Sequence, residues 1–218
     1  MGKITAIRPQ RRPGRYNIMV DDTFAIAISE KVLVDLHLTL GKELDEAHLA
    51  EAARAEDASK ALNAALRLLE VRPRSESEIR TRLDQHGYGK PLIDEIIAKL
   101  RGYGFVDDVQ FTNAWIESRS RSQPAGVHKL RSELSQKGVA KETIETAISE
   151  ISDDDQFELA SKALKKRTKP DITTFEERQA AYARDAGYLA RRGFGWNTIK
   201  TVLKDRYGRV EERDQNEE

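Results

Sequence analysis

Side chains with high strand propensity recur at every second position near the start of the chain, a period typical of strands. This alternation covers residues 16–20, and a second β-prone run covers residues 23–28. The Asp21-Asp22 pair between the two runs predicts a turn. Residues 3–28 are therefore expected to form a small twisted hairpin or meander.

A short helix is predicted directly after this β region. Ser29 is placed to act as its N-cap, and Val32, Leu33 and Leu36 give it an apolar face. A further short extended segment is expected over residues 40–44. Because an isolated hairpin is only marginally stable, we expect the sheet to lean on this helix.

From about Asp57 onward the apolar positions follow a helical period that Gly or Pro interrupts at intervals. An internal repeat explains the interruptions, because aligning Gly87 with Gly138 also aligns many of their neighbours. The aligned pairs are Ile79 with Leu130, Arg80 with Arg131, Leu83 with Leu134, Gln85 with Gln136, Lys90 with Lys141, Ile93 with Ile144 and Ile97 with Ile148. A third copy surrounds Gly193, although its upstream half matches poorly.

The shared core of the repeat is one Leu, one Gly and two Ile or Leu residues at fixed spacing. In the third copy these are Leu189, Gly193, Ile199 and Leu203. Such a Gly is typical of the left-handed position that ends a helix, and apolar residues four apart share one face of the next helix. Each copy therefore contributes one helix before the Gly and one after it.

A leading helix precedes each copy, so that each unit has three helices. Its apolar residues are Leu62, Leu66 and Leu69 in the first unit, Phe111 and Trp115 in the second, and Ala160 and Leu164 in the third. Ser75 and Glu78 form a capping-box pattern, and Asp108 and the acidic run 153–155 are candidate N-caps. Units of this size stack on their neighbours in the chain.

The expected fold is mainly α, with three tandem three-helix repeats in an elongated curved array that follows a small N-terminal β-rich module. The expected divisions are a basic β extension with a short helix (1–56), three repeats (57–106, 107–152 and 153–208) and an acidic tail (209–218).

Composition limits the classes of function. Charged residues make up 34% of the chain and aromatic residues 6%, which favours helices with solvated outer faces. Lys and Arg together equal Asp and Glu at 37 each, so any nucleic-acid contact must come from local patches. The absence of Cys excludes disulfides and thiolate metal sites. No apolar stretch is long enough for a bilayer and residues 1–5 lack the apolar core of a signal peptide, so we expect a cytoplasmic protein that does not contact membranes.

Three motifs, in this order and at these spacings, resemble the RecX family. They are Arg72-Pro73-Arg74-Ser75 with Glu78 and Leu83; Gly104-Phe105-Val106-Asp107-Asp108 leading into Phe111, Trp115 and Arg119; and Arg192-Gly193-Phe194. The similarity covers residues 58–207, about two thirds of the chain. The extension of about 55 residues and the link 123–126 (Gln-Pro-Ala-Gly) depart from a minimal member of the family.

The resemblance implies a non-enzymatic regulator of recombination and DNA repair, with no cofactor. It implies tandem three-helix units that bind the RecA nucleoprotein filament within its helical groove and inhibit its ATP hydrolysis, its extension and strand exchange. We expect a monomer that binds single-stranded DNA weakly, with binding to double-stranded DNA left open. The role of the N-terminal extension also stays open.

Clusters of Arg and Lys are the candidate binding residues, because Arg suits bidentate contacts with carboxylate or phosphate. The candidates for RecA or DNA binding in the repeats are Arg72, Arg74, Arg80, Arg82, Arg119, Arg121, Lys129, Arg131, Lys165, Lys166, Arg167, Arg191 and Arg192, with Lys162 and Lys169 beside the third group. Those in the extension are Lys3, Arg8, Arg11, Arg12 and Arg15. For any single residue a solvated helix face with i,i+4 ion pairs competes with this interpretation, whereas the clusters together favour a partner surface.

The alternative function is a general DNA-binding helical module without recombinase specificity. A three-helix unit with a Gly turn resembles a helix-turn-helix, but the third helices of the first two units are acidic. The acids are Asp94 and Glu95 in the first unit, and Glu142, Glu145 and Glu150 in the second. They would face the phosphates of a DNA groove, so sequence-specific operator binding is not expected.

Four aromatic residues, Trp115, Trp196, Phe105 and Phe194, are candidate stacking platforms for bases. Aromatic residues at helix junctions more often belong to the core, and we favour that interpretation here.

No catalytic or metal-binding pattern is apparent. The histidines (His37, His48, His86 and His128) lack the spacing of a zinc site. The acids 107–108 and 153–155 lie at predicted helix starts, where capping is favoured over Mg²⁺ binding. Gly41-Lys42 lacks the flanking residues of a phosphate-binding loop. We therefore expect neither enzymatic activity nor a metal.

Overall fold

The computed structural model describes residues 1–167 and 170–208, so Lys169 and the predicted acidic tail lie outside the described residues. The chain divides into two compact units. Unit 1 comprises Met1–Arg74 and Ile79–Phe105, and unit 2 comprises Ser75–Glu78 and the chain from Val106 onward. The fold is mainly α with an N-terminal β-rich module, as the sequence predicts. The predicted curvature of the array and the predicted domain divisions stay predictions.

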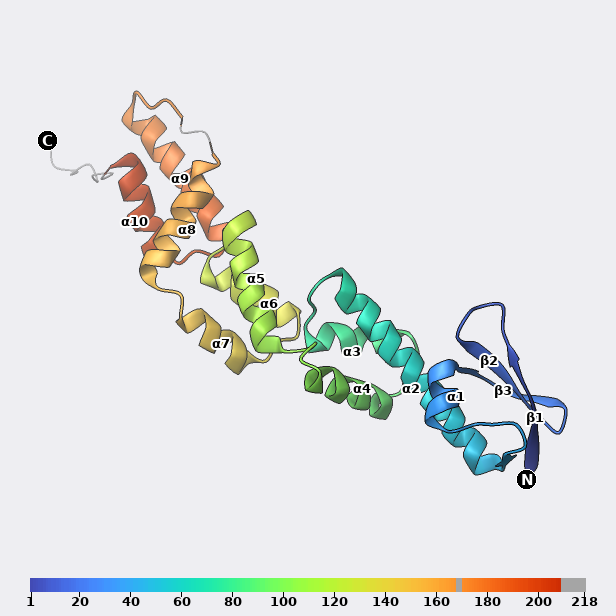
Figure 1. Ribbon diagram of the computed structural model, residues 1–218. Coiled ribbons are helices and arrows are strands. Elements are labelled where there is room, and N and C mark those ends of the chain that lie inside the picture. Colours follow the sequence, from blue (N-terminus) through green and yellow to red (C-terminus); the bar gives the residue numbers. More distant parts are fainter. Residues whose placement is uncertain (168–169, 209–218) are drawn as a thin grey trace, which may run out of the picture. The chain divides into compact units, whose positions relative to one another are not determined.

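The N-terminal sheet in unit 1 is the expected meander. Its strands are β1 (Gly2–Pro9), β2 (Arg15–Val20), β3 (Thr23–Ser29) and β4 (Glu43–Leu44), which form an antiparallel sheet in the order β3-β2-β1-β4 (Figure 1). The β2–β3 turn uses positive φ at both Asp21 (47°) and Asp22 (62°), as tight hairpin turns require. The strand β4 lies within the short extended segment predicted over residues 40–44.

Two helices lie against this sheet, α1 (Glu30–Asp35) and α2 (Glu46–Val71) (Figure 1). The core between them includes Ile4, Ile18 and Ile28, none more than 2% exposed. The helix α2 begins at Glu46, where the Asp45 carboxylate caps it, and not near residue 57 as predicted. It therefore continues through the place where the sequence suggested that the extension ends.

Ser29 holds the N-cap position of α1, but the prediction that its side chain caps the helix is wrong. Its hydroxyl is buried without a hydrogen-bond partner, and its backbone N–H donates instead to Oε2 of Glu56 on α2 (2.7 Å). The other oxygen of Glu56 accepts from Arg15 Nη1 on β2 (2.5 Å). Burial by itself raises the pKa of Glu56, but the bonds from Ser29 and Arg15 outweigh it and lower that pKa. The Glu56 carboxylate thereby joins β2, through Arg15, and β3, through Ser29, to α2.

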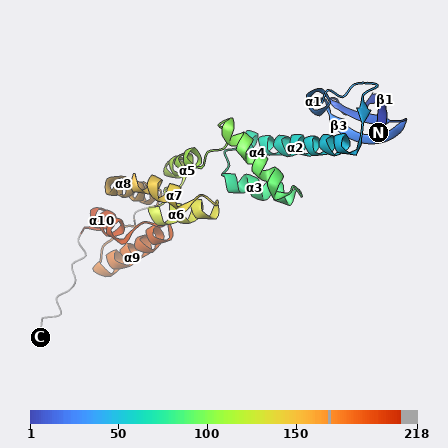
Figure 2. The ribbon, with the colours of Figure 1, turned by 90° about the horizontal axis from the view of Figure 1, so that it is seen from below.

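The three predicted repeats are present as helix triplets. They are α2 with α3 (Glu76–Gln85) and α4 (Lys90–Gly102); α5 (Asp108–Ser122), α6 (Val127–Gln136) and α7 (Lys141–Ser149); and α8 (Asp153–Lys165), α9 (Phe175–Arg191) and α10 (Trp196–Tyr207). Figure 2 shows the triplets α2–α4 and α8–α10. The turn glycines Gly87, Gly138 and Gly193 all have the predicted positive φ, at 84°, 73° and 80°. The equivalent leucines Leu83, Leu134 and Leu189 are all 0% exposed, which confirms the alignment.

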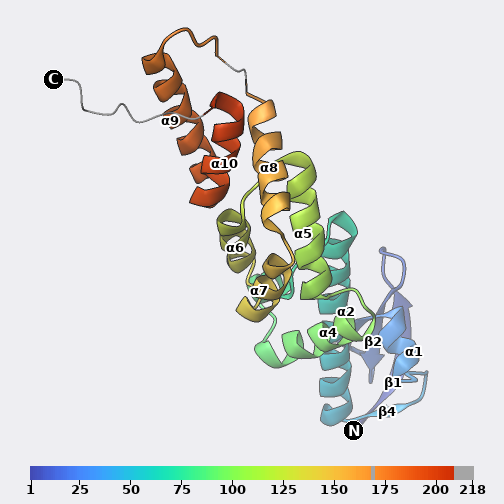
Figure 3. The ribbon, with the colours of Figure 1, turned by 90° about the vertical axis from the view of Figure 1, so that its left-hand side faces the viewer.

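The upstream half of the third repeat matches poorly for a simple reason of length. Its second helix, α9, has 17 residues, whereas α3 and α6 have 10 each. The extra residues lie at the start of α9, so the leading helix α8 is displaced relative to the shared Leu, whereas Asp185 keeps the buried position of Ile79 and Leu130. Within unit 2, α8 still packs against both α9 and α10, and Figure 3 shows α8 beside α5.

Two of the predicted helix caps are wrong by a residue. Asp107, not Asp108, caps α5, accepting the N–H groups of Val109 (2.8 Å) and Gln110 (3.1 Å). Asp108 instead accepts the N–H of Glu76 at the start of α3 (2.9 Å). The cap of α8 is the residue before the acidic run, Ser152, which forms a capping box with Asp155. The predicted capping box of α3, Ser75 with Glu78, is confirmed.

Within unit 2, the turn glycines of the second and third repeats each contact the start of the second helix of the preceding repeat, α3 and α6 respectively. A Cβ on Gly138 would collide with the Ser77 side chain, and a Cβ on Gly193 would collide with the backbone of Lys129. The N–H of Gly126 also donates to the carbonyl of Arg192 (2.9 Å). The link 123–126, singled out in the sequence as unusual, is therefore one half of a close backbone contact. Among the described helices, none combines the length and apolarity that crossing a membrane requires.

The equivalence of the three core leucines predicts a large cost for Leu134→Ala. Removal of a fully buried Leu side chain should lower the free energy of unfolding by about 2–5 kcal/mol. Chemical denaturation measures this change. In the same unit, Val109→Ala is a matched control, since Val109 is 55% exposed and the change should cost less than about 0.5 kcal/mol. Equal midpoints for the two variants would contradict the alignment.

The buried Arg15–Glu56 pair predicts that the N-terminal module loosens in acid. The folded-state pKa of Glu56 lies below its unfolded value, so its contribution is complete above the unfolded pKa, about 4.3, and is lost as pH falls through the folded pKa. The protection factors of the β2–β3 amides, which correct for the slower intrinsic exchange in acid, should fall below about pH 4 in the wild type. In Glu56→Gln, protection should be lower at pH 7 and depend less on pH. The exposed pair Lys31–Asp35 supplies the control, Asp35→Asn, which should leave both properties unchanged.

Candidate partner-binding surface

Several of the predicted basic residues are engaged inside the fold. Arg131 on α6 donates two hydrogen bonds to Glu145 on α7 (2.7 and 2.8 Å), and these bonds lower the pKa of Glu145. Arg80 on α3 forms an ion pair with Asp94 on α4. Both pairs occupy aligned positions of the first two repeats and join the second helix to the third. The acidic third helices and part of the arginine clusters therefore neutralise each other, which sequence spacing within one helix could not reveal.

The α5 cluster contains a second fixed arginine. Arg119 Nε donates to Glu133 Oε2 on α6 (2.7 Å), and its guanidinium lies 4.8 Å from the centroid of the Trp115 ring. Trp115 also donates to the same carboxylate oxygen (3.0 Å) and packs on Phe111. Through these contacts Arg119 joins α5 to α6.

The other three arginines of the first cluster donate hydrogen bonds to groups that lie close to them in the sequence. Arg72 donates to the carbonyl of Pro73 (2.9 Å), Arg74 to that of Leu68 (3.4 Å) and Arg82 to Gln85 (3.2 Å). Only Arg82 among these three arginines is classed as exposed. The structure therefore does not gather them into one free cationic patch.

Two arginines of the third repeat are also fixed by neighbours. Arg167 pairs with the buried Asp185 (3.0 Å) and lies 4.6 Å from the centroid of the Tyr188 ring. Arg192 lies 5.0 Å from the same ring and donates to the carbonyl of Pro124 (3.2 Å). Both hold helices of unit 2 together.

A smaller set of cations is left facing solvent. Arg8, Arg11, Arg12, Lys129 and Arg191 are exposed and have no ion-pair partner among the residues that the structure describes. Three of them flank the β1–β2 turn. Of their neighbours in the extension, Arg15 is held by the buried Glu56, whereas Lys3 is exposed and forms only a surface ion pair with Glu43 (3.7 Å).

Unit 2 also brings the second and third basic clusters together. Lys162 and Lys166 of the α8 region donate to the carbonyls of Ser120 (2.8 Å) and Ser122 (2.9 Å) at the end of α5. Their ammonium groups thereby satisfy carbonyls that the helix end leaves unbonded and offset its negative dipole.

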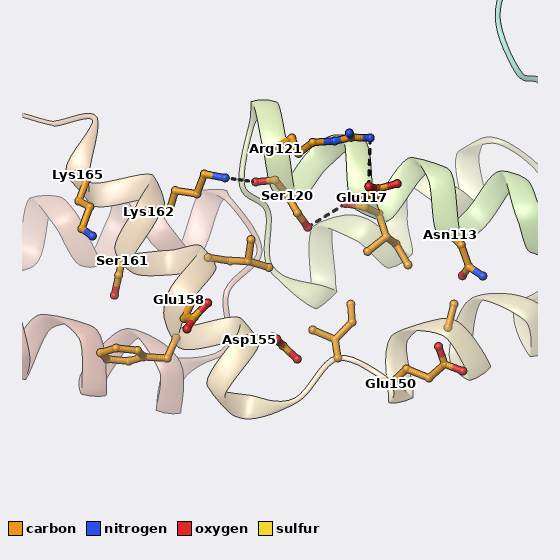
Figure 4. A pocket seen from close by; sticks show the side chains of 15 residues that line it. Asn113, Glu117, Ser120, Arg121, Glu150, Asp155, Glu158, Ser161, Lys162 and Lys165 are labelled. Carbon is orange, nitrogen blue, oxygen red and sulfur yellow. Dashed lines mark hydrogen bonds and ion pairs between the residues drawn. The ribbon is translucent and has the colours of Figure 1, made fainter.

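These contacts border a cleft of about 750 Å³ between α5 and α8. Figure 4 shows Lys162 and Lys165 toward one end of the cleft, Arg121 beside Glu117 along its α5 side, and Glu150 toward the other end, with Asp155 and Glu158 between the ends. Apolar side chains, among them Ile151, line the space between them. Arg121 is 71% exposed and forms only a surface ion pair with Glu117 (3.3 Å), and Lys165 has no ion-pair partner among the described residues. The cleft therefore offers positive charge at the edge formed by Arg121 and Lys165, with acidic residues elsewhere in its lining and an apolar surface between them.

The prediction that the aromatic residues belong to the core holds for two of the four. Phe194 is 4% exposed and Trp115 is partly buried against its cluster, as predicted. The prediction is wrong for Phe105, which is 55% exposed beside Tyr103, and for Trp196, which is 56% exposed. Each of these two follows a glycine at a helix junction, where the chain can turn the ring outward as easily as inward. Over residues 1–167 and 170–208, no group of three acidic or His side chains is arranged to hold a metal ion.

Comparison with known proteins is consistent with the helix triplets. Family models match residues 2–45 ("Regulatory protein RecX N-terminal domain"), 61–100 ("RecX, first three-helix domain") and 107–148 ("RecX, second three-helix domain"). Regulatory protein RecX of Leuconostoc mesenteroides subsp. mesenteroides is 31% identical over 206 residues, which cover 93% of this chain and 75% of that protein. The chain belongs to the RecX family. Its β-rich extension matches a domain of that family and so is not peculiar to this chain.

Other RecX proteins agree in sequence and in structure. Regulatory protein RecX of Bacillus subtilis (strain 168) is 32% identical, with 92% of this chain and 75% of that protein aligned. A crystal structure of regulatory protein RecX has a TM-score of 0.73 at 29% identity and covers 94% of this chain and 100% of its own. The structure of RecX from Lactobacillus salivarius, at 22% identity and a TM-score of 0.58, covers 69% of this chain and 97% of its own and supports the fold alone. The relatives from Leuconostoc mesenteroides and Bacillus subtilis are named regulatory proteins.

Because Arg119 is held in an ion pair and Arg121 is exposed, reversal of the side-chain charge should be costly at Arg119 and nearly neutral at Arg121. Arg119→Glu places a carboxylate against Glu133 and removes the contact with Trp115, so the free energy of unfolding should fall by about 2 kcal/mol. Arg121→Glu, at an exposed position two residues further along α5, should change the free energy of unfolding by less than about 0.5 kcal/mol. Chemical denaturation of both variants tests this, and similar losses would show that the assignment of Arg119 as structural is wrong.

Proposed function

We propose that this RecX-family protein binds the RecA nucleoprotein filament and inhibits its ATPase, its extension and strand exchange, acting as a cytoplasmic monomer without catalysis of its own. Membership of a family of regulatory proteins is the observation that carries this proposal. Two further features support it: the repeat architecture offers surfaces suited to a partner, and the described residues contain no metal cluster.

The α5–α8 cleft is the surface that we propose for the recombinase. Arg121 and Lys165 bring positive charge to its edge without serving the fold, and apolar residues such as Ile151 line it. A protein segment that presents carboxylates beside apolar side chains is complementary to such a surface. Arg119 and Arg131, which are fixed in internal ion pairs, are not proposed as contacts.

Contact with DNA forms the second part of the proposal, and it is weak. The chain carries no net charge, so no general field draws it to phosphates. The exposed cations Arg8, Arg11 and Arg12 form a local basic loop that can contact a DNA backbone. A general DNA-binding module without recombinase specificity stays the alternative function.

A double reversal in the cleft, Arg121→Glu with Lys165→Glu, separates the two functions. If the cleft faces carboxylates of RecA, like charges meet and binding to RecA filaments on single-stranded DNA should weaken about 10- to 100-fold. Inhibition of the filament's ATPase should be lost in parallel. Affinity for bare single-stranded DNA across a salt series should hardly change.

The matched control carries the same change of charge at the first residues of α4 and α7, Lys90→Glu with Lys141→Glu. Both lysines are exposed, and acids are tolerated at helix N-termini. If the cleft cations instead bind phosphates, the log K against log salt line for bare DNA should flatten by about 1.4 in the cleft variant alone. Equal losses on bare DNA and on filaments would favour the general DNA-binding module, and full inhibition by the cleft variant would rule out the cleft.

A further inference from the structure

The third helix of the third repeat differs in charge from its two counterparts. Asp94 on α4 and Glu145 on α7 occupy one aligned position, and Lys200 holds that position on α10. The arginine that pairs with the acid in the first two repeats is replaced by Ala186 in the third. The acidic character that argues against nucleic-acid contact by α4 and α7 is therefore absent from the first turns of α10.

Lys200 does not neutralise an acid but lies over an exposed ring. Its Nζ is 5.6 Å from the centroid of the Trp196 ring, and Trp196, the first residue of α10, is 56% exposed. In the first two repeats a lysine, Lys90 or Lys141, begins the corresponding helix. Among the described residues, the third helix of the third repeat is therefore the one that begins with an accessible aromatic surface beside a cation, the pair of features on which unpaired bases and their phosphates bind.

A pocket of about 370 Å³ lies beside this ring within unit 2. Its lining comes from the starts of α6, α8 and α10 and consists of Val127, Ile151, Asp153, Gln156, Gly195, Trp196, Asn197 and Thr198. Four of these residues have polar side chains, and the others, among them Ile151 and Trp196, are apolar. Such a pocket suits a base, which has an apolar face and a polar edge.

The start of α10 offers unused hydrogen-bond donors to this pocket. Its N-cap is Gly195, which has no side chain to cap the helix, and the first intrahelical bond runs from the N–H of Ile199 to the carbonyl of Gly195 (3.0 Å). The backbone N–H groups of Trp196, Asn197 and Thr198 have no bonded partner among the described residues. Free N–H groups at a helix N-terminus favour an anion such as phosphate.

A buried side chain supplies an independent indication of a ligand. Gln156 on α8 lines the same pocket and is 4% exposed. Its Oε1 accepts the N–H of Val127 (3.2 Å), but its Nε2 has no hydrogen-bond partner within the part of the chain that is described. Buried polar groups are nearly always bonded, so an unbonded amide at a pocket wall indicates a missing acceptor.

We propose that this pocket, defined by Trp196, Gln156 and the start of α10, binds one nucleotide of single-stranded nucleic acid. The base stacks on the Trp196 indole, and the amide of Gln156 donates to a base carbonyl. The phosphate lies at the free N–H groups of α10, near Lys200. The carboxylate of Asp153, also in the lining, repels phosphate but accepts from a base N–H group such as the N3–H of thymine, so it places the base and not the phosphate on its side of the pocket. The inference rests on the weak DNA contact proposed above.

Tryptophan fluorescence with a single-stranded oligo-dT, in the absence of RecA, tests the inference. The chain has two tryptophans, so emission that oligo-dT quenches in the wild type but not in Trp196→Phe belongs to Trp196. We expect such quenching, and we expect Trp196→Ala to weaken oligo-dT binding by roughly 5- to 100-fold. Phe105→Ala, which removes an equally exposed ring from unit 1, should leave the affinity unchanged.

A second variant tests the amide. Gln156→Glu keeps an oxygen for the Val127 N–H but replaces the Nε2 donor with a negative charge, so it should weaken binding of oligo-dT. Its unfolding transition is measured beside the wild type to show that it folds. If it does not fold, Trp196→Ala decides the matter alone.

Three results would overturn the inference. The first is oligo-dT binding without quenching, which would leave DNA contact elsewhere, as at the basic loop of the extension. The second is equal quenching by an abasic strand of the same length, which would show a phosphate site without base stacking. The third is quenching by poly-glutamate but not by oligo-dT, which would assign the pocket to an acidic protein segment. Because RecA is absent from the test, none of these results bears on inhibition of the filament.

Discussion

The close backbone approach at the turn glycines is the constraint on which the packing of unit 2 depends. Gly193 presses on the backbone of Lys129, and its carbonyl accepts the N–H of His128 (3.1 Å). The start of α6 therefore needs no side-chain cap, because the turn of the next repeat satisfies it. The start of α9 has a capping box of its own, Thr174 with Glu177. A residue with a side chain in place of either glycine would have to adopt an unfavourable positive φ, and its Cβ would push the helices apart.

This constraint explains why so much of the fold could be predicted from the sequence. A glycine that must adopt positive φ and a leucine that must be buried recur at fixed spacing, and the pattern survives even where α9 is longer than its counterparts. Helix starts were harder to predict. Asp107 and Asp108 carry the same group, and the choice between them depends on the distant N–H of Glu76, which Asp108 accepts. Ser29 loses its capping role in the same way, because Glu56 on another helix binds its N–H.

The candidate site could be predicted only as a set of basic residues, and not as a division into fixed and free ones. Arg80, Arg119 and Arg131 each find their acid on the following helix, fourteen residues away. Such pairs lie beyond the i,i+4 window in which charge patterns are usually judged. The same comparison accounts for Lys200. The third repeat lacks both the arginine and the acid of this pair, so the ammonium group of Lys200 lies over the Trp196 ring and not in an ion pair.

The two surfaces proposed in unit 2 are neighbours, because Ile151 lines both the α5–α8 cleft and the pocket beside Trp196. A partner that fills both must present protein carboxylates and an unpaired strand at close range, and a nucleoprotein filament has this composition. A bare strand offers the pocket its base but offers the cleft only phosphates, with no apolar side chain to pack against Ile151. Under this proposal the electrical neutrality of the whole chain acts as a filter, since each surface alone binds weakly and a partner that occupies both is bound more tightly.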